Sequence, residues 1–204
     1  MDTIPLRDAY RSLLDAATTV AGSGDTMPVP STGEWNADQI LAHVAIVNAT
    51  TIATVAAASA GAPTTYDNRT AHDAWTIERV IGLAGGNAGL RERIRLQADA
   101  LCALGGPMLS ETELDTLVPT LLLSHDKVQV NQPLPLRDLI TGLAEVELPG
   151  HTRQLLSLVP PSTTGNQGVT GCHLPPGGSV VVHQHPSGPV RADDFVQASQ
   201  SFSQ

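Results

Sequence analysis

Four stretches of the chain place apolar residues at the spacing of an α-helix, and each stretch is followed by Gly or Pro. They span residues 6–21, 35–60, 72–104 and 136–159. In the first stretch, apolar side chains recur every three or four residues, as one helix face requires: Leu6, Tyr10, Leu13, Leu14 and Ala17. Aromatic residues make up only 3% of the chain, so the core has to be built from Ala, Leu, Val and Ile. The sequence therefore predicts an all-α fold with four main helices.

Two of these helices contain residues that disfavour helical structure. Glycines occupy positions 82, 85, 86 and 89 of the third helix, and each costs up to ~1 kcal/mol relative to Ala. We expect a kink or a close helix contact there. Pro149 in the fourth helix has no backbone N–H and disfavours the helical conformation at Leu148, so we expect the helix to be broken near this point.

A small β-hairpin is predicted between the third and fourth helices. Residues 117–123 and 128–131 are rich in Leu and Val, and they flank a polar segment at 124–127. Pro119 cannot donate a hydrogen bond to a neighbouring strand, which predicts that the first strand lies at the edge of its sheet.

The composition changes at Pro160 to Pro, Gly, Ser, Thr and Gln. We therefore divide the chain into a helical domain at 1–159 and a C-terminal extension at 160–204 that is mobile in part. Within the extension, residues 169–174 and 179–185 are suited to form a hairpin.

Charge and composition exclude several classes of protein. The formal net charge of −9 argues against binding of nucleic acid, which needs a basic surface. No apolar run is expected to span a membrane, and the N-terminus has no secretory signal pattern. The two cysteines, Cys102 and Cys172, do not suggest a disulfide framework or a Cys-rich zinc site. A cytoplasmic protein without a nucleic-acid or membrane partner is expected.

Three residues in two of the helices have the chemistry of metal ligands. His43 lies in the second helix, eight positions after Trp35, while Glu147 and His151 lie one turn apart in the fourth helix. Two imidazoles and a carboxylate from two helices can hold a divalent ion and leave positions open for a substrate.

The order of these motifs resembles that of the DinB family of four-helix bundles. The similarity covers about residues 5–159 and includes the W-x(7)-H start of the second helix and the H-x-x-Q-L run in the fourth. It also includes three shorter segments, at 109–114, 118–119 and 133–139. The branch that the chain resembles most contains mycothiol-dependent maleylpyruvate isomerases and related thiol-dependent transferases. In that family, one histidine of the second helix and two of the fourth bind a divalent metal.

Glu147 occupies the position of one family histidine, and this departure leaves two hypotheses. In the first, His43, Glu147 and His151 form a 2-His-1-carboxylate site for zinc, nickel, manganese or iron, of which zinc is preferred. In the second, Pro149 turns Glu147 away, and the histidines of a metal-free bundle are hydrogen-bonded polar groups of the interior.

The resemblance implies an enzyme that uses a low-molecular-weight thiol such as mycothiol. The thiol is transferred to a small-molecule electrophile or used for cis–trans isomerisation. Candidate substrate contacts are Gln39, Arg79 and Arg153, the two arginines as partners of a carboxylate. A metal-dependent hydrolase is an alternative, and so is a metal-free binding protein, with a homodimer as one arrangement.

The extension contains a second group of candidate residues. His183 and His185 follow two glycines, as at the start of a cupin metal motif, but the later Glu of that motif is missing. Cys172 and His173 are adjacent, with no third residue to position them. We therefore do not assign a site or an internal nucleophile to the extension.

Overall fold

A computed structural model of the chain describes residues 1–23, 34–124 and 127–159, which are mostly helical and include a small three-stranded sheet. The longer helices are α1 (Ile4–Gly22), α2 (Ala37–Ser59), α3 (Ala74–Ala84) and α4 (Asn87–Gly105). The shorter ones are α5 (Glu111–Leu114), α6 (Leu136–Gly142) and α7 (Leu148–Ser157), with a 3-10 turn η2 (Arg69–His72) and a π-helical segment η3 (Leu143–Glu147). The strands are β1 (Tyr66–Asp67), β2 (Leu117–Ser124) and β3 (Lys127–Pro135).

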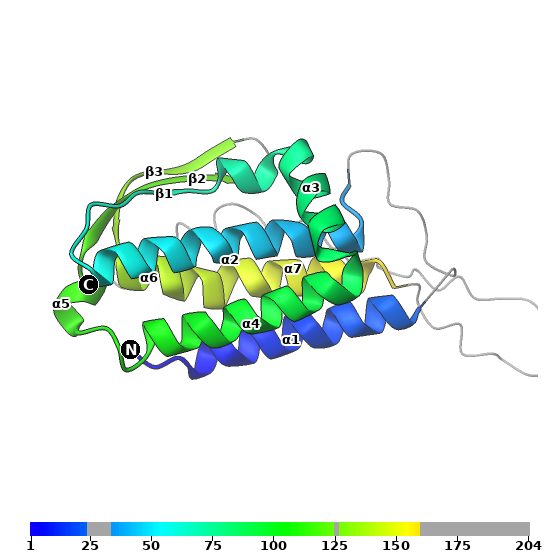
Figure 1. The fold of residues 1–204 in the computed structure, drawn as a ribbon, viewed down its shortest axis with the longest axis horizontal. Helices are drawn as coiled ribbons and strands as arrows, with labels where there is room; N and C mark the ends of the chain where they lie inside the picture. The colour runs from blue at the N-terminus through cyan, green and yellow to red at the C-terminus, as the bar shows by residue number, and fades with distance from the viewer. Residues whose placement is uncertain (24–33, 125–126, 160–204) are drawn as a thin grey trace, which may run out of the picture.

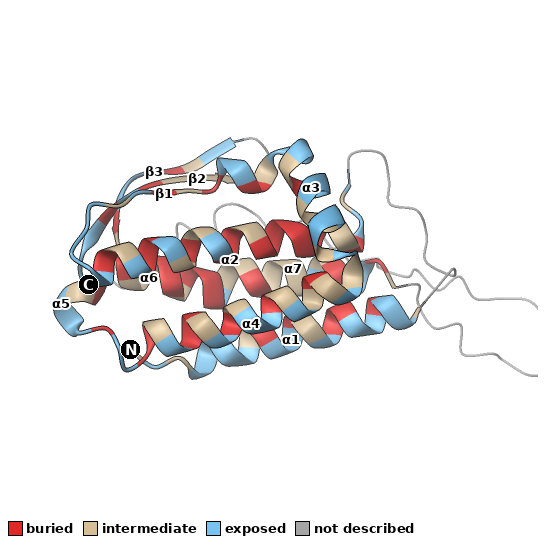
Figure 2. Cartoon of the chain, viewed as in Figure 1, coloured by how far each residue is buried: buried red, intermediate tan, exposed pale blue. Residues whose placement is uncertain are grey.

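The helices form a bundle around an aliphatic core. Helices α1 and α2 lie alongside a column made of α6, η3 and α7, and α4 packs against α1 and α2 (Figure 1). Their facing sides are buried (Figure 2), and the largest of the fully buried aliphatic side chains are Leu13, Ile40, Leu41, Leu90, Ile94, Leu101, Leu114, Leu136, Ile140, Leu148 and Leu155. The described chain is thus mostly helical, and its arrangement is compatible with the predicted helical bundle.

Helix α2 lies at the centre of the bundle and is apolar around most of its circumference. It begins with the capping box formed by Asn36 and Gln39, in which each side chain bonds the other's backbone N–H. Among the described residues, α2 is long and apolar enough to cross a membrane by length and composition, so the expectation that no apolar run reaches this length was wrong. However, 67% of that apolar window is buried within the fold.

The predicted third helix is in fact two helices. Gly85 and Gly86 have φ of 77° and 84°, a left-handed conformation that only glycine adopts readily, and the chain turns sharply there between α3 and α4 (Figure 1). Gly89 permits the close approach of the two helices, since a Cβ on it would lie 1.8 Å from the Ala84 carbonyl oxygen. The glycines thus end one helix and begin another.

The predicted break at Pro149 takes the form of a π-helical segment. The Leu148 N–H bonds the Leu143 carbonyl, five residues earlier, so the turn ahead of Pro149 is one residue wider than an α-helical turn. This wider turn relieves the clash that a proline ring makes with the preceding turn, and the column continues into α7. Glu147 therefore remains on the inner side of the column.

The hairpin of β2 and β3 is confirmed, but β2 is not an edge strand. The sheet order is β1-β2-β3, with β1 parallel and β3 antiparallel to β2. Strand β1 pairs only with Thr120 and Leu121, so the prediction from Pro119 failed because β1 was not anticipated. The extension at 160–204, with its proposed hairpin and its cysteine and histidines, lies outside the described residues.

Candidate metal centre

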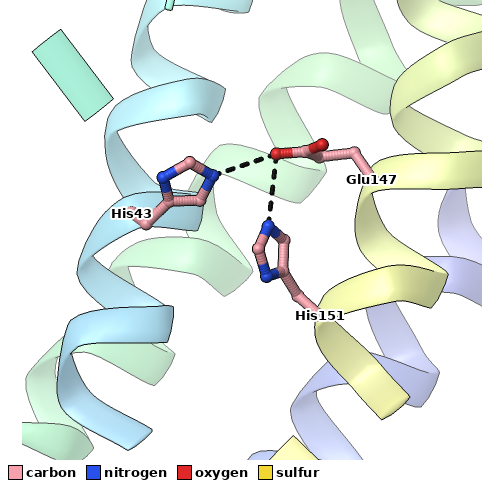
Figure 3. Close-up of side chains that lie close together, drawn as sticks. All are labelled: His43, Glu147 and His151. Carbon is pink, nitrogen blue, oxygen red and sulfur yellow. Dashed lines mark hydrogen bonds and ion pairs between the residues drawn. The ribbon is translucent and has the colours of Figure 1, made fainter. Parts of the chain in front are cut away.

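His43, Glu147 and His151 converge on one point inside the bundle (Figure 3). Glu147 Oε1 lies 3.0 Å from His43 Nε2 and 3.2 Å from His151 Nε2. The three ligand atoms all lie within 4.8 Å of one another. In a tetrahedral zinc site with bonds of about 2.0–2.1 Å, ligand atoms are roughly 3.3–3.5 Å apart. Small side-chain movements would therefore suffice to admit a divalent ion.

The second nitrogen of the His43 ring is held by the backbone. His43 Nδ1 lies 2.8 Å from the Ala71 carbonyl oxygen, which can only accept a hydrogen bond, so Nδ1 carries a proton. This arrangement directs the Nε2 lone pair of a neutral ring toward Glu147 and His151. A metal-binding histidine is oriented in the same way by a carbonyl or carboxylate behind it.

His151 is oriented in the same manner by a side chain. Its Nδ1 lies 2.9 Å from Gln154 Oε1, one turn further along α7, and its Nε2 faces the same Glu147 oxygen as His43 does. Both imidazoles thus have oxygen acceptors at both nitrogens. A neutral imidazole carries only one proton, so it can donate to only one of its two oxygen neighbours. The contacts with Glu147 are therefore satisfied when the rings take up added protons or when a metal ion lies between the rings and the carboxylate.

The electrostatics of the three groups favour an ionised carboxylate. Burial raises the pKa of Glu147, but hydrogen bonds from His151 and His43 outweigh it and hold the pKa well below its usual range. Burial lowers the pKa of His151, but the contact with Glu147 outweighs it and raises that pKa overall. Glu147 is therefore a negatively charged ligand candidate at neutral pH.

Access to the centre differs among the three side chains. The exposed fraction of the side chain is 2% for His43, 15% for His151 and 31% for Glu147. The buried side of the centre is thus closed by α2, while solvent reaches it along η3 and α7. A substrate would have to approach from this second side.

In the described part of the chain, the three predicted substrate contacts form no hydrogen bond or ion pair with His43, Glu147 or His151. Gln39 caps α2, and its amide nitrogen donates to Glu78 at 3.1 Å. Arg79 is exposed on α3, with its guanidinium 5.5 Å from the centre of the Trp75 ring. Arg153 is exposed and lies two residues after His151, which places it on the opposite side of α7.

Several neighbours of the centre were not assigned to it from the sequence. The Trp35 ring packs on His43 with centroids 4.9 Å apart, and the His72 ring meets His43 edge-on at 5.1 Å. Trp35 is half-buried and packs against the core. Ala71 acts through its carbonyl group, which no residue type signals, and Gln154 acts through its side-chain amide.

No family model matches the chain, and no curated protein or solved structure matches it either. The DinB-like resemblance therefore stays a prediction from the sequence motifs.

Proposed function

We propose that this protein is a DinB-like, metal-dependent enzyme that activates a small thiol for transfer to an electrophile or for isomerisation. The observation that carries the proposal is the convergence of His43 Nε2, His151 Nε2 and Glu147 Oε1 on one point. In each imidazole, the other ring nitrogen is hydrogen-bonded to an oxygen acceptor. This donor set suits zinc best, and nickel, manganese or iron as further options.

In this proposal, the side chains of the protein bind the metal ion, and their neighbours orient them. His43 is fixed by Ala71, and His151 by Gln154, so little reorganisation is needed when the centre is filled. Glu147 supplies the negative charge that offsets part of the ion's charge. A divalent ion held here lowers the pKa of a coordinating thiol and so supplies a nucleophile near neutral pH.

The chemistry of the described residues supports a nucleophile that comes from outside the chain. Cys102 is buried on α4 against Arg7, and burial raises the pKa of its thiol, which makes it a poor nucleophile. It lies on none of the elements that carry the three ligand candidates. In the transfer reaction, the thiol sulfur adds to an activated carbon–carbon double bond and the proton passes to the neighbouring carbon. Reversal of this addition after bond rotation gives isomerisation.

Activity is expected to need both the metal and an added thiol. The full-length protein without a histidine tag, loaded with one equivalent of zinc, should form thioether from an activated alkene with at least one small thiol in a panel, measured by mass spectrometry. The double variant Cys102→Ser/Cys172→Ser is the matched control and should retain the activity, whereas a chelator should abolish it.

Other outcomes distinguish the alternatives. Cleavage of ester substrates that needs the metal but no thiol would replace the transferase by a hydrolase. An absence of turnover in every combination, from protein that binds no metal, would contradict the enzyme and favour the binding protein.

A further inference from the structure

We infer that Asn68 is a positioning residue of the metal centre. Asn68 couples the affinity of this centre for metal to the pairing of the β2–β3 hairpin with the bundle. This inference rests on the proposed metal site and concerns a residue outside its ligands. Asn68 lies between β1 and η2 and is 7% exposed.

The side chain of Asn68 extends the sheet beyond the last paired residue of β1. Its Oδ1 accepts from the Leu123 N–H at 2.8 Å, and its Nδ2 donates to the Leu123 carbonyl at 3.0 Å. The backbone N–H of Asn68 also donates to the Leu121 carbonyl at 3.3 Å. Asn68 thus imitates a peptide group and binds the start of η2 to strand β2, near the end of the hairpin in Figure 1.

The same residue fixes the turn that holds His43. The Ala71 N–H donates to the Asn68 carbonyl at 2.9 Å, and Asn68 Nδ2 lies 3.3 Å from His72 Nε2. The carbonyl of Ala71 in turn accepts from His43 Nδ1 at 2.8 Å. Because Ala71 and His43 are almost completely buried, few other arrangements of this turn can satisfy these groups.

Only asparagine among the common side chains makes this set of contacts. The amide supplies one acceptor for Leu123 and two N–H donors, one for Leu123 and one for His72. Alanine would remove all three, and the turn would keep only the backbone bond from the Asn68 N–H to Leu121 as its hydrogen bond to β2 at this residue. The Ala71 carbonyl would then be held less firmly, and the orientation of His43 toward Glu147 would be less well defined.

The test compares Asn68→Ala with Asn48→Ala in the full-length protein. Asn48 is buried too and bonds two other elements, through Tyr10 on α1 and Gln97 on α4, but it forms no hydrogen bond with η2. Both variants should have a lower melting temperature. Only Asn68→Ala should bind zinc about tenfold more weakly in a calorimetric titration, as the loss of an outer-shell contact typically does.

A second measurement does not depend on the metal. In metal-free wild-type protein, the Nδ1 proton of His43 should give a slowly exchanging NMR signal, and that signal should be lost in Asn68→Ala but kept in Asn48→Ala. If Asn68→Ala does not fold, Asn68→Asp serves instead, because it keeps the acceptor for Leu123 and lacks both donors. Unchanged zinc affinity and an unchanged His43 signal would overturn the inference. Wild-type protein that binds no zinc would contradict the proposed function, while the NMR comparison would still decide the role of Asn68.

Discussion

Replacing His43 by Ala is expected to lower the affinity for zinc by at least about 100-fold, since a three-ligand site reduced to two is weak. His43 is the candidate ligand that α2 contributes, and its ring is held in place by the Ala71 carbonyl and the rings of Trp35 and His72. The remaining pair on the column, Glu147 and His151, lies one turn apart and cannot surround an ion. Calorimetric titration of metal-free, untagged protein measures the effect.

His72→Gln is the matched control for this variant. Its ring lies beside that of His43, but it is not one of the three groups whose ligand atoms converge. The control should still bind one equivalent of zinc and lose far less affinity than His43→Ala, because it keeps all three ligand candidates. Wild-type affinity in His43→Ala would remove His43 from the site and contradict the proposed centre.

Replacing Gly89 by Ala is expected to destabilise the fold by about 3 kcal/mol, which is the upper part of the usual range for overpacking. The added methyl group would lie 1.8 Å from the Ala84 carbonyl oxygen, so the end of α3 or the start of α4 must move. For a chain of this length, the melting temperature should fall by roughly 6–12 °C.

Gly82→Ala is the control for this prediction. Gly82 lies within α3, and a Cβ there would meet no atom within 4 Å. Since Ala forms helix better than Gly by up to ~1 kcal/mol, the melting temperature should stay the same or rise. Equal destabilisation by both substitutions would show that the close approach at Gly89 does not control the α3–α4 turn.

The helices could be predicted because their apolar residues repeat at the helical period. The division between α3 and α4 could not be predicted, since a glycine within a helical pattern is compatible with either a kinked helix or two separate helices. The positive φ of Gly85 and Gly86 decides between them, and it depends on how α4 packs against α2. Strand β1 was missed because it has only two residues and pairs with a strand more than fifty positions later.

The ligand candidates could be predicted from the sequence, because their residue types and the spacing of Glu147 and His151 are typical of metal ligands. The direction of the Glu147 side chain could not be predicted, since Pro149 allowed either orientation until the π-helical segment was known. The groups that orient the histidines were also hidden. A backbone carbonyl such as that of Ala71 has no signature in a sequence, and Asn68 acts through a contact with Leu123 across the fold.

Diffraction at the zinc absorption edge, from crystals of the untagged protein grown with one equivalent of zinc, tests the metal centre most directly. We expect one anomalous peak at about 2.0–2.2 Å from His43 Nε2, His151 Nε2 and a carboxylate oxygen of Glu147. A map without a peak at this position, or with zinc bound only elsewhere on the chain, would contradict it.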